Sequence, residues 1–164
     1  YTPVFAKKGC TSFWAQPINI KVKRYSEIFL IIKTFLKYKR PQVELTTPDY
    51  RYDGELLLAA FCNGSIFGDG LYIDPGAQID DGQLKLTLLG KVSLFDYVKN
   101  VLRVKRGKKI KHPEAHYLNI SYPVQLKSNA GVLHAETDGE YISGQAFTID
   151  LDVRKLRLLP IQKR

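Results

Sequence analysis

Cysteine is scarce in this chain of 164 residues, which has only two, Cys10 and Cys62. They lie far apart in the sequence, with no CxxC pair and no Cys/His spacing typical of zinc ligands. The pattern therefore indicates neither a zinc site nor a disulfide framework. We expect two buried or functionally idle free thiols in a cytoplasmic protein.

Long hydrophobic runs are missing as well. The most apolar stretch, EIFLIIKTFL at residues 27–36, is too short to span a bilayer and contains Lys33. The chain opens on Tyr1 with neither a signal peptide nor an Arg-rich transit sequence, so we expect it to be part of a longer protein. Its 45% hydrophobic and 25% charged residues predict one soluble globular domain with a real core.

Common catalytic signatures are also absent: the sequence has no GxSxG, no HExxH and no GxxxxGK[ST]. It does contain the tripeptide Asp-Gly-Glu twice, at residues 53–55 and 138–140. The first follows TTPDYRY, where a strand begins, and is expected to be a plain turn. The second is either a hairpin turn or a pair of carboxylates close enough to serve one reacting centre.

Positive charge is unevenly distributed within a formal net charge of +9. Lys and Arg cluster in residues 21–40, 99–111 and 154–164, whereas residues 41–98 are acidic. Such clusters create a local positive potential that attracts the phosphates of lipid headgroups, nucleotides or nucleic acid. A solvated charged face is the alternative.

Two segments have the apolar spacing of amphipathic helices. The first covers residues 25–40 and ends before Pro41, because the residue before a proline is disfavoured in the helical region. The second begins at Ser93, an N-cap with Asp96 three residues later, and Gly107 closes it. Its predicted core-facing stripe is Leu94, Tyr97, Val98, Val101 and Leu102.

The remaining periodic segments are short and rich in β-formers, and Gly, Asn, Asp or Pro separates them. They are QVELTT, ELLLAAFCN, GQLKLTLLG, HYLNISYPVQLKS, VLHAET, QAFTIDL and KLRLLPI. Many closely spaced strands with two helices predict a mainly β domain, a β-sandwich with two peripheral helices that covers residues 1–164.

Carboxylates and glycines gather between two of these strands, in CNGSIFGDGLYIDPGAQIDDGQLKL at residues 62–86. Four aspartates in so long a loop indicate either tight turns or a hard cation on oxygen ligands. Composition alone favours turns.

An ordered set of motifs in and after this loop resembles the C-terminal domain of the diacylglycerol kinase-like lipid kinases. This family includes bacterial soluble lipid kinases and the sphingosine and ceramide kinases. The resemblance extends over roughly residues 24–160. The matching motifs are Asn63-Gly64, Gly68-Asp69-Gly70, Pro75-Gly76-Ala77, Asp80-Asp81-Gly82-Gln83-Leu84 and Asp138-Gly139-Glu140.

The resemblance implies a two-domain enzyme that transfers the γ-phosphoryl group of ATP to a lipid hydroxyl, as on diacylglycerol. The nucleotide-binding domain with its GGDGT motif is absent from this chain, which corresponds to the substrate-side half and should be inactive alone. The family normally has an unbroken glycine run where Asp69 stands here. That difference affects how closely a ligand can approach the backbone.

The resemblance also assigns roles to individual residues. It implies Glu140 as the general base and Asp138 as its partner near the phosphates and Mg²⁺. Asn63, Gly64, Gly68 and Gly70 would form a loop close to the substrate. A structural Mg²⁺ would be held by the carboxylate of Asp81 and the carbonyls of Gln78 and Gln83. An Asx-turn at Asp81 with no metal is the alternative.

A lipid kinase without a membrane span must reach its substrate at an interface, so a peripheral position on the cytoplasmic membrane surface is expected. The basic segment RVKRGKKIKH at residues 103–112 follows an amphipathic helix and is the candidate contact with anionic headgroups. Two other functions stay open: a related kinase of a soluble substrate such as NAD, and a non-enzymatic basic β domain that binds nucleic acid. The sequence lacks the aromatic-basic pattern of common RNA-binding modules, so no nucleic-acid partner is predicted.

Overall fold

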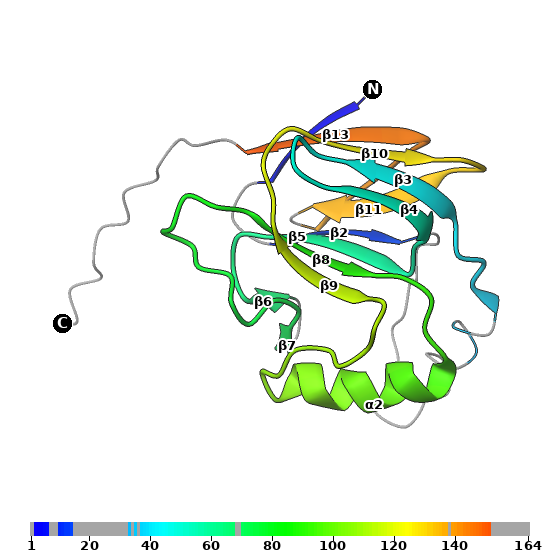
Figure 1. The fold of residues 1–164 in the computed structure, drawn as a ribbon, viewed down its shortest axis with the longest axis vertical. Coiled ribbons are helices and arrows are strands. Elements are labelled where there is room, and N and C mark those ends of the chain that lie inside the picture. The colour runs from blue at the N-terminus through cyan, green and yellow to red at the C-terminus, as the bar shows by residue number, and fades with distance from the viewer. Residues whose placement is uncertain are drawn as a thin grey trace.

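The fold is mainly β and consists of two large sheets, a two-stranded hairpin and one long helix, α2, among the described residues. The computed structural model describes residues 2–6, 10–14, 33, 35, 37–67, 70–137 and 139–151. The two large sheets form stacked layers, and α2 lies below the lower layer (Figure 1).

The upper layer is a five-stranded sheet with the order β1-β13-β10-β3-β4. All its strand pairs are antiparallel except β1 with β13, which is parallel. Its strands are β1 (Thr2–Ala6), β3 (Gln42–Thr46), β4 (Arg51–Glu55), β10 (Val124–Ser128) and β13 (Ala146–Leu151).

The lower layer is a six-stranded antiparallel sheet with the order β12-β11-β2-β5-β8-β9. Its strands are β2 (Cys10–Trp14), β5 (Leu58–Cys62), β8 (Lys85–Leu89), β9 (Ala115–Asn119), β11 (Leu133–Thr137) and β12 (Glu140–Gly144). A small hairpin, β6 (Ile66–Phe67) with β7 (Leu71–Tyr72), lies beside it.

The core fills the space between the two large sheets. Alternate residues point inward because side chains of a strand alternate between its faces, as in the buried Val43 and Leu45 of β3 and Ala59 and Phe61 of β5. Burying each large apolar side chain contributes roughly 1.5–3 kcal/mol. The fold is therefore sandwich-like, as the alternating patterns predict.

The second face of the six-stranded sheet is covered too, which explains why β5 is apolar at every position. Its outward residues Ala60 and Cys62 pack with Ala77, and the half-buried Leu58 and Phe67 join them. Helix α2 (Leu94–Lys105) covers the neighbouring area through Tyr97 and Val104, which line a small apolar cavity with Leu58.

Both predicted ends of the second helix are confirmed. Ser93 is the N-cap and its Oγ accepts from the backbone N–H of Asp96, while Gly107 follows the last turn with φ +68°. The predicted stripe is only partly right, since Val98 and Leu102 are 39% and 55% exposed. Among the described residues no helix is long and apolar enough to span a membrane.

Most predicted strands are present, with HYLNISYPVQLKS divided into β9 and β10. Strands β1, β2 and β4 and the β6–β7 hairpin were not predicted. The predicted strand KLRLLPI lies outside the described residues, as does most of the predicted helix over residues 25–40, in which Lys33, Phe35 and Lys37 are helical.

Two predictions are wrong. Asp53-Gly54-Glu55 is not a turn but the end of β4, where it pairs with β3, and the turn lies earlier, at residues 47–50. Cys62 is disulfide-bonded rather than an idle thiol, and its register partner on β2 is Cys10. The separation of Cys10 and Cys62 in the sequence gave no sign that the pairing of β2 with β5 places them opposite each other.

Candidate functional site

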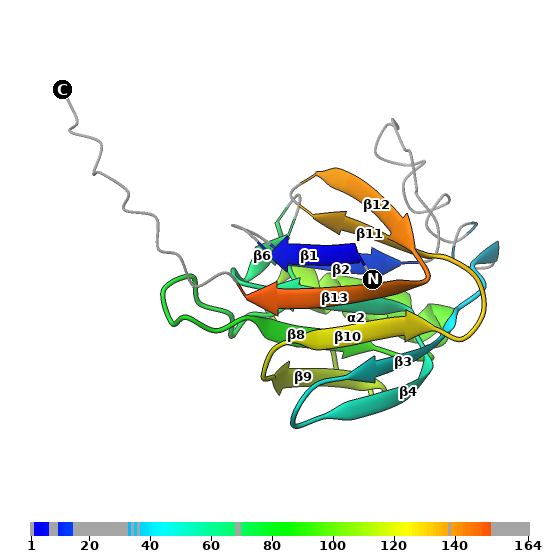
Figure 2. The same ribbon diagram turned by 90° about the horizontal axis from the view of Figure 1, so that it is seen from above.

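The predicted site segments converge on one edge of the six-stranded sheet. The register aligns Glu136, Ser12, Ala60 and Thr87 in a row across β11, β2, β5 and β8. Beyond this row, the C-terminal ends of β11 and β5 and the N-terminal end of β8 lie at the same edge. Neighbouring strands are about 4.8 Å apart, so the ends of β11 and β5 are separated by roughly 10 Å. The β11–β12 turn and the β7–β8 loop lie at this end of the sandwich (Figure 2).

The β11–β12 turn presents Glu140 at this edge. Gly139 has φ +85°, a left-handed conformation that suits glycine, and Glu140 is the first residue of β12. Glu140 pairs with Thr137 in the register and its side chain is exposed. It shares a sheet face with Ile142, so it extends the inner face of the sheet beyond the core. Asp138 lies outside the described residues.

The loop after β5 touches the loop before β8. Asn63 and Gly64 directly follow Cys62, and a Cβ on Gly64 would lie 3.7 Å from the Ile79 side chain. Ile79 itself lies between Gln78 and Asp80 in the sequence. The structure therefore brings together the predicted substrate loop and the predicted metal loop. Gly70 is exposed with φ +75°, and Gly68 lies outside the described residues.

Asp81 forms an Asx-turn in the loop before β8. Its Oδ1 accepts from the backbone N–H of Gln83 at 2.9 Å, and Gly82 between them has φ +70°. Asp81 is exposed and its other oxygen is free of hydrogen bonds to described residues. An exposed carboxylate with open access to water fits Mg²⁺, which keeps several waters and seldom receives a full protein cage. No group of three or more Cys, His, Asp or Glu among the described residues could hold a metal by side chains alone.

Sequence analysis missed the residue that braces this loop, Asp74. Its side chain is 2% exposed, and its carboxylate accepts from the backbone N–H of Gly76 at 2.9 Å and from the Thr87 hydroxyl at 3.3 Å. Lys85 donates to the carbonyl of Gly76 at 2.6 Å. A threonine inside the apolar strand KLTLL was the available signal, because a buried hydroxyl needs a partner.

Comparison with protein families matches residues 14–160 to the YegS C-terminal NAD kinase beta sandwich-like domain. The chain belongs to this family. Its resemblance to diacylglycerol kinase-like lipid kinases is thereby confirmed.

Curated relatives of this YegS C-terminal domain include two that are each named "Probable lipid kinase YegS-like". The one from Shewanella frigidimarina (strain NCIMB 400) is 31% identical over 98 residues, which are 57% of this chain and 32% of the relative. The one from Yersinia pestis (strain Pestoides F) is 28% identical over 114 residues, 69% of this chain and 36% of the relative. The chain thus spans about a third of the length of these relatives.

A solved structure shares the fold. The crystal structure of a "putative diacylglycerol kinase" from Bacillus anthracis str. Sterne matches with a TM-score of 0.55 at 18% identity. The match covers 88% of this chain and 56% of that one, so the same fold occurs there as part of a longer chain.

Proposed function

We propose that this chain is the substrate-side domain of an ATP-dependent lipid kinase, which transfers the γ-phosphoryl group to the hydroxyl of a diacylglycerol-like lipid. The observation that supports the proposal is the convergence at one sheet edge of Glu140, the Asn63-Gly64 loop and the Asp81 turn. Membership of a family with relatives named lipid kinases is consistent with it. The nucleotide would be bound mainly by another domain of the full-length protein.

Glu140 is proposed as the general base. Phosphoryl transfer needs positioning, charge stabilisation and a group that accepts the hydroxyl proton, and ATP with Mg²⁺ supplies the group that is transferred. Glu140 is held at the start of a strand but is exposed beyond the core, so a substrate hydroxyl can reach it. Asp138, two positions earlier across Gly139, is proposed to face the phosphates and their metal.

The loops around Glu140 are proposed to position the substrate. Asn63, Gly64, Gly68 and Gly70 would lie close to the lipid hydroxyl, where small residues leave room for a ligand against the backbone. Asp81, with the carbonyls of Gln78 and Gln83, would hold a structural Mg²⁺ that ties the loop to the start of β8. This ion would brace the domain and take no part in the reaction.

The decisive experiment is Glu140→Gln in the full-length protein. The amide keeps the size of the side chain but cannot accept a proton, so kcat for lipid phosphorylation should fall by roughly 10²–10⁴. Because Glu140 is exposed, the thermal unfolding midpoint should stay within about 1 °C of wild type. Radiolabelled ATP with dispersed diacylglycerol measures the rate.

Two matched glutamates serve as controls. Glu136→Gln changes the same hairpin but the opposite face of the sheet, where Glu136 pairs with Tyr141. Glu55→Gln changes the other Asp-Gly-Glu, where Glu55 makes long ion pairs of 3.6 Å with Arg40 and 3.8 Å with Lys91. Both variants should retain wild-type rates. Equal, mild effects at all three positions would leave residues 138–140 as a hairpin turn without a catalytic role.

A further inference from the structure

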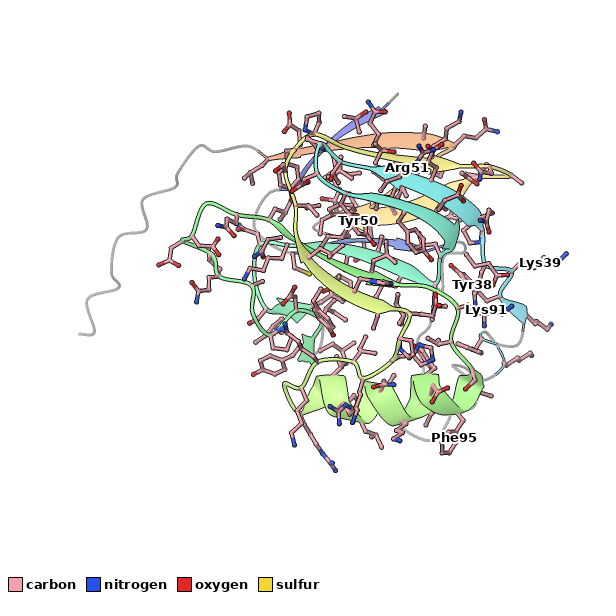
Figure 3. The ribbon with its side chains drawn as sticks, in the orientation of Figure 1. Tyr38, Lys39, Tyr50, Arg51, Lys91 and Phe95 are labelled. Carbon is pink, nitrogen blue, oxygen red and sulfur yellow. The ribbon has the colours of Figure 1, made fainter. Side chains whose placement is uncertain are left out.

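Helix α2 has two apolar faces, and among the described residues only one of them packs against the rest of the fold. The inner face carries Tyr97 and Val104, which line the cavity between the helix and the six-stranded sheet, and the ring of Phe35 packs on Tyr97 with centroids 5.1 Å apart. The outer stripe is Phe95, Val98 and Leu102, exposed by 76%, 39% and 55%. These residues recur at intervals of three and four, so they form one continuous face. Phe95 points away from the sheets (Figure 3).

Basic residues share the outer stripe. Lys99 is four residues after Phe95 and three before Leu102, and Arg106 is four residues after Leu102, so both lie beside the apolar side chains. Both are exposed. An apolar face mixed with cations and free of acids differs from an ordinary solvated surface, in which charges of both signs alternate.

The basic segment (residues 103–112) continues this surface and is held in place. The backbone N–H of Lys111 donates to the buried Asn100 side chain at 2.9 Å, and that of Ile110 donates to the Tyr117 hydroxyl at 2.8 Å. The N–H of Lys108 donates to the carbonyl of Arg103 at 3.0 Å. The segment therefore has a defined shape, and its charges need little further ordering to bind a partner.

The charge of this region is uncompensated. Residues 97–113 contain no Asp or Glu. The ion pairs found among the described residues include none made by a basic side chain of residues 99–111. A partner for this surface must therefore supply both negative charge and an apolar phase. An anionic lipid bilayer supplies both, since its headgroups attract Lys and Arg and its acyl boundary accepts apolar side chains.

We propose that the outer stripe of α2 and the basic segment form a docking surface for an anionic bilayer, with Phe95 and Leu102 entering the headgroup–acyl boundary. The proposal goes beyond the kinase function, because the surface lies on α2 rather than at the Glu140 edge. It also revises the expectation that the basic segment alone makes the contact. The apolar stripe gives the surface a preference for a lipid phase that charge alone does not provide.

Vesicle sedimentation of the full-length protein tests the proposal without any phosphoryl transfer. We expect binding to equimolar phosphatidylcholine–phosphatidylglycerol vesicles and little binding to pure phosphatidylcholine. Phe95→Ala/Leu102→Ala should weaken binding by roughly tenfold or more, as expected for two partly inserted side chains. Lys105→Gln/Arg106→Gln should weaken it by roughly 25-fold, about fivefold for each charge removed.

Matched controls lie on other surfaces. Val132→Ala removes an apolar side chain that is 47% exposed in the loop between β10 and β11. Arg51→Gln/Lys127→Gln removes one Arg and one Lys, both exposed on the five-stranded sheet. Both controls should bind vesicles as wild type does. Phe95→Trp should also give a blue shift of tryptophan emission on anionic vesicles, whereas Val132→Trp should give none.

Several outcomes would overturn the proposal: equal binding to both vesicle types, wild-type binding by either α2 variant, or no vesicle binding at all. A dimer in sedimentation velocity that Phe95→Ala/Leu102→Ala converts to monomer would assign the surface to a second copy instead. A failure of the kinase proposal would be seen in a different measurement from a failure of the docking proposal. In that case no phosphorylation of short-chain, water-dispersed diacylglycerol occurs, whatever the vesicle binding.

Discussion

At the scale of single residues, Asp81 has one observed role and one proposed role, each on a different carboxylate oxygen. One oxygen accepts from the Gln83 N–H and shapes the turn before β8. The other oxygen accepts no hydrogen bond from a described residue, and we propose that it binds the structural Mg²⁺. The two roles can be separated, because asparagine retains an oxygen for the N–H but loses the negative charge.

Asp81→Asn should abolish stabilisation of the domain by Mg²⁺. The wild-type free energy of unfolding should rise with Mg²⁺, by about 2.7 kcal/mol at a concentration 100 times the dissociation constant, whereas the variant should not respond. Urea unfolding with and without Mg²⁺ measures both. Asp80→Asn changes the neighbouring exposed carboxylate and should respond as wild type does. A wild-type protein indifferent to Mg²⁺ would show that the turn is only an Asx-turn.

At the scale of elements, α2 shows what the sequence could and could not predict. Ser93 and Gly107 marked both ends correctly, because caps are local chemistry. The buried face was only partly predicted, because apolar residues occupy both sides of the helix. In the folded domain, the side with Tyr97 and Val104 packs against the six-stranded sheet, whereas Phe95 on the other side is exposed.

The same limit applies to the two Asp-Gly-Glu tripeptides. The tripeptide at residues 138–140 lies where β11 is followed by β12, at the hairpin that its Asp-Gly pair predicts, and Glu140 begins β12. Residues 53–55 have the same composition but extend as β4, because pairing with β3 overrides local turn propensity. The loops of the candidate site were predicted from motif order. Asp74 was missed because its role depends on a hydrogen bond from Thr87, which lies on β8.

The cap of α2 provides a direct test at this scale. Ser93→Ala should lower the free energy of unfolding by about 1 kcal/mol, because the Asp96 N–H loses its acceptor at 3.2 Å. Ser93→Thr should restore most of the loss, since threonine also caps and keeps a hydroxyl that can donate to the Asp96 carboxylate, as Ser93 does at 2.6 Å. Urea denaturation at pH 7 distinguishes the variants. Equal stability of Ser93→Ala and wild type would contradict the capping role.

At the scale of the whole molecule, half-buried tyrosines couple stability to alkaline pH. Burial, with the Glu114 carboxylate adding to it, raises the pKa of Tyr52 to about 12. Burial likewise raises the pKa values of Tyr97, Tyr117 and Tyr122. The folded state therefore holds these protons more tightly than the unfolded chain, whose tyrosines ionise near pH 10.

The free energy of unfolding should be fully retained below about pH 10 and should fall as the pH rises towards 12. Tyr52→Phe should flatten part of this decline, because phenylalanine does not ionise. At pH 7 it should cost about 1 kcal/mol, for the lost hydrogen bond to the Glu55 carbonyl. Urea unfolding between pH 8 and 11 measures how the free energy of unfolding of wild type and variant depends on pH. A variant curve parallel to that of wild type would contradict the assignment to Tyr52.

The central place of β2 has a consequence for synthesis on the ribosome. Ser12 pairs with Ala60 on one side and Glu136 on the other, and the second partner follows it by 124 positions. At about 5–20 residues per second, translation leaves one side of β2 unpaired for roughly 6–25 s. During that interval the nascent chain carries an open strand edge that can pair with other chains. Within the six-stranded sheet, the β11–β12 hairpin that presents Glu140 is added last, so we expect a ribosome-bound intermediate of this domain to bind chaperones.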